Sequence, residues 1–497
     1  MNKQIITKDI FSSLVVFLVA LPISLGVAVA AGVEPYLGLT CAIIGGLVAS
    51  TLTGSPLQIS GPSTGLAVMV LHVVQKFGVA ALIPLGIITG LFQMAIALFK
   101  VGHLFQATPP ALVKAMLSGI GFLIVISQVF IFFGSPMSSD SYMNIINLPS
   151  MVNTGISGGG NSLLYGGIVV ALVLGIMIFW SKQKSIIFHL IPGSLVAVIV
   201  SAAITAGMGW DIPKISFSSS FADIFANIHY TQALDSISIS LILYSIGFAF
   251  VASVETMLCV SALDKMTHTH SKYNKTILAQ GIGNLFAGAI GTIPIVGVIS
   301  RSAANVEAGA KTKLAGVLNA VWIMMIFFVP FVLQLIPIAA LVGLLLFIGF
   351  KLLDLSHIFD YVKKYNKTSW IFATTFILTI SVDLLIGVVA GFIVAIFILL
   401  FEVLKYDLIV EEEYGNKVLT FTGKLSFLDL PVLNKELNDA GNSAPSNLEV
   451  CLREVQYLDP TIKDHLDQWA IKMEKKGINV EIKNSPSSDE DGGDSPI

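Results

Sequence analysis

Apolar runs recur from residue 11 to residue 404, separated by short polar connections. Many approach the length of about 20 residues that an α-helix needs to cross a bilayer. We expect membrane spans near residues 11–32, 36–53, 79–99, 110–133, 164–180, 186–207, 237–260, 314–336, 338–353, 368–380 and 383–404. Three further segments, 62–76, 276–290 and 299–309, are short or interrupted. The pattern therefore predicts an α-helical polytopic membrane protein with about fourteen spans.

The pattern changes after Lys405, where short strand-like and helix-like segments alternate. We expect strands within 418–423, 447–459 and 478–482, and helices at 430–440 and 461–477. Alternating elements of this kind predict a small α/β domain. The predicted domains are a transmembrane transport domain at 1–405, a cytoplasmic domain at 406–484, and a disordered tail at 485–497, which is acidic and rich in Gly, Ser and Pro.

Composition supports a membrane protein. Hydrophobic residues make up 55% of the 497 residues and charged residues only 12%, whereas soluble domains carry about 25% charged residues. The net charge of −3 gives no reason to expect a nucleic-acid partner. The three cysteines, Cys41, Cys259 and Cys451, are scattered, so we expect neither a disulfide framework nor a zinc site. We find no catalytic motif and no phosphate-binding loop, so an enzyme or an ATP-driven pump is not predicted.

Lysines mark alternate connections between the spans. They occur in the N-terminal segment and in the connections near residues 100, 182–184, 265–275, 311–313 and 351–367. The longest connection of the other set, about 134–163, has no Lys or Arg. Cytoplasmic loops of membrane proteins are enriched in positive charge. We therefore expect the protein to lie in the inner membrane of the cell with both termini in the cytoplasm. The first apolar run is expected to be a retained span.

Two Pro- and Gly-broken segments occupy comparable places in the two halves of the chain. LQISGPSTGLAVMVLHVVQ covers 57–75, and TIPIVGVISRSAANVEAG covers 292–309. Paired broken segments are a sequence indication of a transporter with inverted repeats, here about 8–210 and 235–405. Their helix N-termini, with unpaired N–H groups, attract an anion. The alternative is a pair of kinked helices whose small residues serve close packing.

Arg301 is one of only two arginines and lies inside the second broken segment. Its planar guanidinium suits an anion ligand. Hydroxyl groups nearby add hydrogen-bond donors. The predicted substrate site therefore comprises Ser63, Thr64, Ser300, Arg301 and Ser302.

Glu255 lies in an apolar run without an adjacent lysine. Intramembrane carboxylates face cavities and mark ion paths. We expect Glu255 to take up a proton or Na⁺ as the anion binds, and no other cofactor or metal. The alternative is a permanent counter-ion of Arg301.

Other polar residues have structural interpretations. Asp383 is expected to cap the last span or to lie at the outer interface, and Gln280 and Asn284 to satisfy irregular backbone. His268 and His270 are expected to be solvated in a loop rather than to bind a metal.

Four segments together resemble the SulP family of anion permeases: 59–70, 251–265, 279–291 and 300–316. The resemblance implies a fold of seven plus seven spans, shared with uracil permeases, in which a core domain moves against a gate domain. It also implies a homodimer and a C-terminal STAS domain, which can bind a cytoplasmic partner.

By position, Ser63 matches the family's third-span residue at the anion site, and Ser300 and Arg301 match the tenth-span pair. Glu255 matches the eighth-span acid that is linked to coupling. The chain departs from the family at Ile23, where many members have Gln. It also departs at Asp459-Pro460-Thr461-Ile462, so regulatory serine phosphorylation is not expected there.

The function expected from residues and resemblance is secondary active transport of a small inorganic anion across the bilayer by alternating access. Bicarbonate and sulfate are favoured over chloride, with coupling to Na⁺ or H⁺ in symport. The alternatives are an anion channel or exchanger without cation coupling, and a nucleobase permease on the same fold.

Overall fold

The computed structural model describes residues 3–483 except 103–107, 136, 139–140, 159, 184–190, 217–227, 229, 365–366, 404–405, 414–415, 426–428 and 443–446. The expected tail at 485–497 lies outside the described residues. The chain divides into two compact units, Met1–Phe392 and Ile393–Ile497.

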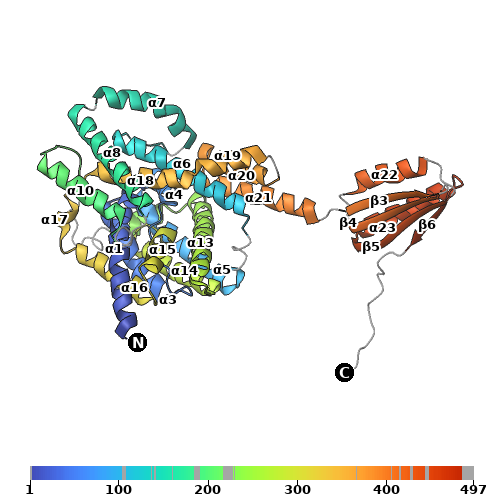
Figure 1. Ribbon diagram of the computed structural model, residues 1–497, viewed down its shortest axis with the longest axis horizontal. Helices are drawn as coiled ribbons and strands as arrows, with labels where there is room; N and C mark the ends of the chain where they lie inside the picture. Colours follow the sequence, from blue (N-terminus) through green and yellow to red (C-terminus); the bar gives the residue numbers. More distant parts are fainter. Residues whose placement is uncertain are drawn as a thin grey trace. The chain divides into compact units, whose positions relative to one another are not determined.

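The first unit is helical, apart from two very short strands (Figure 1). Its first half contains α1 (Lys3–Ala30), α2 (Pro35–Ile44), a π-helical turn (Gly45–Ala49), α3 (Ser50–Leu52), β1 (Ser60–Gly61), α4 (Ala67–Phe77), a 3₁₀ turn (Val79–Ala81), α5 (Leu82–Leu98), α6 (Pro110–Phe132), α7 (Ser141–Gly158), α8 (Gly160–Lys182) and α10 (Gly193–Gly207). The second half contains α12 (Tyr230–Asp235), α13 (Ile239–Thr267), α14 (Tyr273–Ile290), β2 (Val296–Gly297), α15 (Ile299–Glu307), α16 (Leu314–Ile326), α17 (Pro330–Leu333), α18 (Ile338–Leu353), α19 (Leu355–Lys364), α20 (Lys367–Ser381) and α21 (Leu384–Val403). In each half a long helix and a second helix (α1 and α2, α13 and α14) precede a short strand and a short helix (β1 and α4, β2 and α15), which is the order expected of a repeat.

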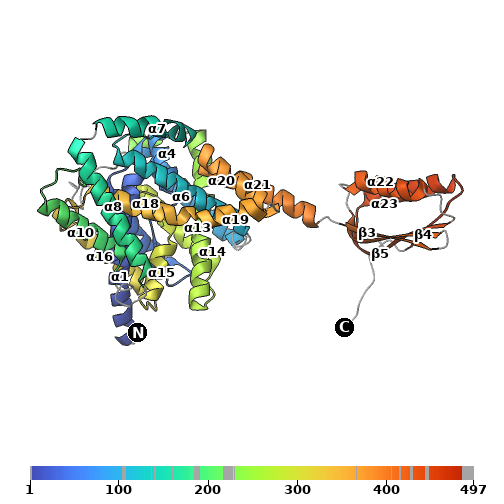
Figure 2. The ribbon, with the colours of Figure 1, turned by 45° about the horizontal axis from the view of Figure 1, so that its top comes forward.

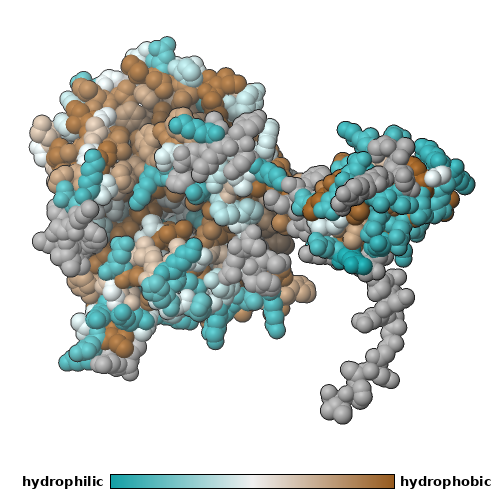
Figure 3. Space-filling view, turned by 45° about the vertical axis from the view of Figure 1, so that its right-hand side comes forward, coloured by the Kyte–Doolittle hydropathy of each residue, from teal (hydrophilic) through white to brown (hydrophobic). Residues whose placement is uncertain are grey.

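The helices of the first unit have the lengths and surfaces of membrane spans. Six of the described helices are long and apolar enough to cross a bilayer, and five shorter ones are apolar. Large side chains such as Phe99, Ile239 and Phe328 are exposed. Figure 3 shows apolar side chains over much of this unit and hydrophilic ones over the second. The first unit is therefore a multi-pass membrane domain.

The segment 276–290, expected to be short or interrupted, lies in α14, which runs unbroken for 18 residues from Tyr273 to Ile290. Its glycines serve close packing instead. A Cβ on Gly288 would lie 2.5 Å from the Ile87 nitrogen, and one on Gly281 would lie 2.8 Å from the Gly90 oxygen. The helix therefore lies directly against the backbone of α5.

The described helices pack as two bundles. In the core bundle, α5 packs against α13 and α14, and α1 packs against α2, α15 and α16. In the gate bundle, α6 packs against α18 and α20, and α8 packs against α10 and α18. α21 joins the gate bundle, since Gly387 and Gly391 lie against Thr379 and Thr375 of α20. This division agrees with the core and gate domains expected from the resemblance.

The two broken segments meet in a buried two-stranded antiparallel sheet. Ser60 pairs with Gly297, and Gly61 pairs with Val296. The Val298 N–H continues the pairing by donating to the Ile59 carbonyl at 3.0 Å. Backbone N–H and C=O groups within the membrane must form their hydrogen bonds inside the protein. Each broken segment obtains from the other the backbone hydrogen bonds that it cannot form alone.

The second unit is a four-stranded sheet in the order β3 (Tyr406–Glu413), β4 (Asn416–Leu425), β5 (Asn447–Leu458) and β6 (Asn479–Lys483). β3 and β4 are antiparallel, and the other two pairs are parallel. Helices α22 (Leu430–Asn442) and α23 (Pro460–Glu474) cover one face (Figure 2), where Phe421, Leu466 and Trp469 are buried. The expected α/β pattern is confirmed, although β3 was not predicted.

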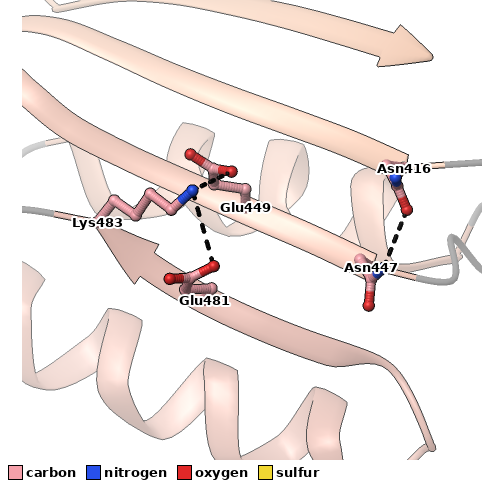
Figure 4. A network of polar contacts seen from close by, with 5 residues as sticks. All are labelled: Asn416, Asn447, Glu449, Glu481 and Lys483. Carbon is pink, nitrogen blue, oxygen red and sulfur yellow. Dashed lines mark hydrogen bonds and ion pairs between the residues drawn. The ribbon is translucent and has the colours of Figure 1, made fainter.

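Figure 4 shows polar side chains of this sheet. Asn447 bonds to Asn416 at 3.1 Å, and the Lys483 ammonium donates to Glu449 at 2.8 Å and lies 3.8 Å from Glu481. The bond to Glu449 is the main reason why the pKa of Lys483 is raised.

Candidate anion site between the two broken segments

Arg301 lies in the first turn of α15 and is the largest fully buried side chain among the described residues, with 0% exposure. Its Nη2 donates to the Pro62 carbonyl at 3.2 Å, so it reaches from the second half of the chain to the first. Nε and Nη1 have no hydrogen-bond partner within the described parts of the chain. The guanidinium therefore keeps donors for another acceptor.

Gly61 leaves space for the guanidinium of Arg301 beside β1. A Cβ at residue 61 would lie 2.5 Å from Arg301 Nη1, closer than real Cβ contacts come. A side chain at residue 61 would therefore displace the guanidinium from its place beside the strand.

Glu255 lies on α13 and is bonded to Ser63. The Ser63 hydroxyl donates to Glu255 Oε1 and accepts from the Gly65 N–H at 3.1 Å. Glu255 Oε2 is buried and has no partner among the described residues. No ion pair within 4.0 Å that joins described residues involves Glu255 or Arg301. In this structure the carboxylate is thus bonded to a serine rather than paired with the arginine.

The other predicted donors occupy different places. Ser300 is exposed at the start of α15, and Thr64 is partly buried beside Ser63. Ser302 is fully buried, and its hydroxyl donates to the Val298 carbonyl at 2.7 Å and accepts from the Ile59 N–H at 2.9 Å. The geometry disagrees with Ser302 as an anion ligand, because its proton is committed to the backbone and it joins α15 to the first broken segment.

Two amide side chains of α14 bond to the broken segments: Asn284 satisfies irregular backbone as expected, whereas Gln280 bonds to a side-chain hydroxyl. Asn284 accepts from the Ile295 N–H at 2.6 Å and donates to the Ile295 carbonyl at 3.0 Å. It also donates to Gln93 of α5 at 2.8 Å, and Gln280 donates to Ser60 at 2.6 Å. Gln93 was missed by the sequence analysis, although its position as a lone amide in an apolar run is the same indication that identified Asn284.

The remaining expectations concern residues away from Arg301. Asp383 accepts from the Leu385 N–H at 2.7 Å, so it caps α21 as predicted, and it also accepts from the Tyr244 hydroxyl at 3.3 Å. His268 and His270 are exposed. No group of three or more metal-binding side chains occurs among the described residues.

The chain resembles known transporters over most of its length. Residues 6–375 match the sulfate permease family. A putative sulfate transporter, YvdB of Bacillus subtilis, is 25% identical over 92% of this chain and 87% of its own. The bicarbonate transporter BicA of Picosynechococcus is 26% identical over 78% of this chain and 69% of its own.

Two solved structures share the fold. The transmembrane domain of a cyanobacterial BicA superposes with a TM-score of 0.66 over 79% of this chain and 98% of that one, at 22% identity. The murine anion transporter Slc26a9, in its inward-facing state, superposes with a TM-score of 0.77 over 97% of this chain and 86% of that one, at 18% identity.

Proposed function

The chain belongs to the sulfate permease family of membrane transporters, and from this premise we propose that it carries a small inorganic anion by secondary active transport. Bicarbonate and sulfate are the favoured substrates, ahead of chloride, and the transport is coupled to Na⁺ or H⁺ by alternating access. The names of the relatives, a putative sulfate transporter and a bicarbonate transporter, support this choice.

The observation that carries the proposal is the buried, incompletely bonded guanidinium of Arg301. A buried charge without a counter-charge is costly, so an anion that binds beside it relieves that cost. The free N–H groups in the first turn of α15 and the positive end of its dipole favour negative charge at the same place. The site therefore selects a compact anion.

The alternatives fit these features less well. A neutral nucleobase leaves the charge of Arg301 uncompensated. A channel or exchanger without cation coupling leaves the buried carboxyl of Glu255 without a role.

We further propose a homodimer in the cell's inner membrane with both termini in the cytoplasm. The second unit would then be a STAS-like domain that offers its surface to a cytoplasmic partner.

Uptake into proteoliposomes tests the proposal. We expect the wild-type protein to accumulate labelled bicarbonate or sulfate under an inward sodium or proton gradient. The uptake rate of R301A should be lower by about tenfold or more, as expected for the loss of a charged ligand. R453A is the matched control, because Arg453 is the other arginine and is exposed in the second unit. Equal rates for R301A and R453A would remove Arg301 from the site, and no uptake of bicarbonate, sulfate or chloride would contradict anion transport.

A further inference from the structure

The Ser63 hydroxyl is bonded so that its single proton is already used. A serine hydroxyl has one proton to donate and two lone pairs that accept. The proton goes to Glu255 Oε1, and one lone pair accepts from the Gly65 N–H. The side chain is only 3% exposed, so water does not provide a ready replacement. While this bond lasts, Ser63 has no proton for an anion.

Ser63 also adjoins the arginine. Arg301 Nη2 is bonded to the carbonyl of Pro62, the residue that directly precedes Ser63. An anion on the guanidinium therefore approaches the peptide that carries the serine. An ionised Glu255 and an incoming anion compete for one hydroxyl proton.

We propose that Ser63 couples proton uptake to anion binding: its proton is donated to Glu255 while that carboxylate is ionised, and to the anion beside Arg301 once Glu255 has taken a proton from solution. This inference rests on the proposed function and selects H⁺ as the coupling ion. One proton is added to one carboxylate oxygen, and no other covalent bond changes. A protonated Oε1 donates to the free lone pair of Ser63, and a proton on Oε2 leaves Oε1 a weaker carbonyl acceptor. Either form releases the serine proton to the anion.

The surroundings favour such an exchange. Glu255 Oε2 is buried and unpartnered within the described residues, so it is an oxygen that can receive the proton. A Cβ on Gly65 would lie 3.2 Å and 3.4 Å from the two carboxylate oxygens and 3.4 Å from Ser63 Oγ. The glycine therefore leaves room for the carboxyl group to meet the serine.

The pH dependence of Glu255 has to be considered together with the ionisable groups on the elements that pack against α13. Of the elements that pack against α13, α5 and β2 contain none. The ionisable residues on the remaining packed elements and on α13 itself are His72 and Lys76 of α4, Arg301 and Glu307 of α15, Tyr273 and Lys275 of α14, and Tyr244, Cys259, Asp264 and Lys265 of α13. α21, which meets α13 through Phe250 and Phe392, adds Asp383 beside Tyr244. Among these, Glu255 is the carboxyl group bonded to Ser63.

A double-mutant cycle separates this exchange from simple charge repulsion. The dissociation constants of sulfate and of chloride are measured on purified protein from about pH 8 to about pH 5, a range in which both anions keep their charge. The variants are S63A, S63T, E255Q and S63A/E255Q. The wild type should bind more tightly as the pH falls, with a Kd that drops by about tenfold across this range and so gives log Kd a slope against pH. At the alkaline end, E255Q should bind about tenfold more tightly than the wild type and show no slope.

The decisive comparison is the effect of E255Q in the S63A background, which should be no more than about twofold. S63T keeps a hydroxyl and should keep the slope, which also controls for damage to folding. If E255Q tightens binding equally in the wild-type and S63A backgrounds, the Glu255 carboxylate acts only through its charge and the inference is overturned. A dependence on sodium without a dependence on pH overturns it as well. Absence of any anion transport would instead contradict the proposed function.

Discussion

The contact between Gly61 and Arg301 shows that the absence of a Cβ atom at residue 61 determines where the guanidinium lies. The guanidinium bonds to Pro62 and lies where a Cβ of residue 61 would be. An arginine carries its charge at the end of a long chain, so its position depends on what the backbone opposite leaves open. Gly61 is therefore a positioning residue for the charge.

We expect G61A to weaken sulfate or bicarbonate binding by about tenfold or more, since the added methyl group displaces a charge-assisted ligand. Binding is measured by calorimetry or by the concentration dependence of uptake. Gly175 of α8 is the matched control, because a Cβ there meets nothing within 4 Å. If G61A and G175A bind alike, Arg301 tolerates displacement and the positioning role is wrong.

Residue roles around the site were only partly predictable. The composition identified Arg301, because a rare residue in an apolar segment needs a reason. Sequence could not tell which hydroxyl is free, because that depends on which backbone groups lie opposite. Ser302 meets the Ile59 N–H, and Ser63 meets Glu255, across separations of 243 and 192 residues. No local pattern encodes such contacts.

At the scale of elements, glycine residues have two structural roles that the sequence pattern does not distinguish. Near Pro62 a glycine accompanies a broken segment, whereas in α14 glycine marks a helix that lies against the backbone of α5. The first kind lies in extended backbone between helices, and the second lies inside an unbroken helix. Helix α7, within a predicted loop, was missed because its apolar and polar residues do not form a full span.

The glycine contact between α14 and α5 predicts a stability effect. G288V should lower the free energy of unfolding by about 1–3 kcal/mol or more, because overpacking forces apart two helices in backbone contact. The thermal midpoint in detergent, followed by size-exclusion chromatography, gives the measurement. G207V is the comparison, since Gly207 in α10 has open space at its Cβ position. Midpoints that agree between the two variants would show that α14 can move away from α5 at no cost.

At the scale of the whole membrane domain, two hydrogen bonds among the described residues join α13 and its neighbour α4 to α21 and to the segment after α6. Tyr244 of α13 donates to Asp383 at the start of α21, and Gln75 of α4 donates at 2.8 Å to the carbonyl of Met137, which follows α6. In the proposed alternating-access cycle, a contact between the two bundles stabilises the conformation in which it forms. These bonds are therefore expected to set the balance between conformations rather than the affinity of the site.

Removing both bonds tests whether they affect the balance between conformations or the affinity for the anion. In Y244F/Q75L the maximal uptake rate should change by about threefold or more, in proportion to bonds of about 1 kcal/mol, while the dissociation constant of the anion changes by less than about twofold. Y230F is the control, because the Tyr230 hydroxyl donates at 2.7 Å to the carbonyl of Ala289 in α14 and contacts no gate-bundle residue through this bond. A change in affinity as large as the change in rate would place these residues in the binding site itself.

The pairing of β1 with β2 also has a consequence for the time course of synthesis. Arg301 follows its partner Pro62 by 239 residues. At about 5–20 residues per second, the ribosome needs on the order of tens of seconds to make that stretch. During this interval the backbone of the first strand has emerged without the chain that completes it. The nascent protein must therefore keep this polar segment out of lipid until its second half arrives.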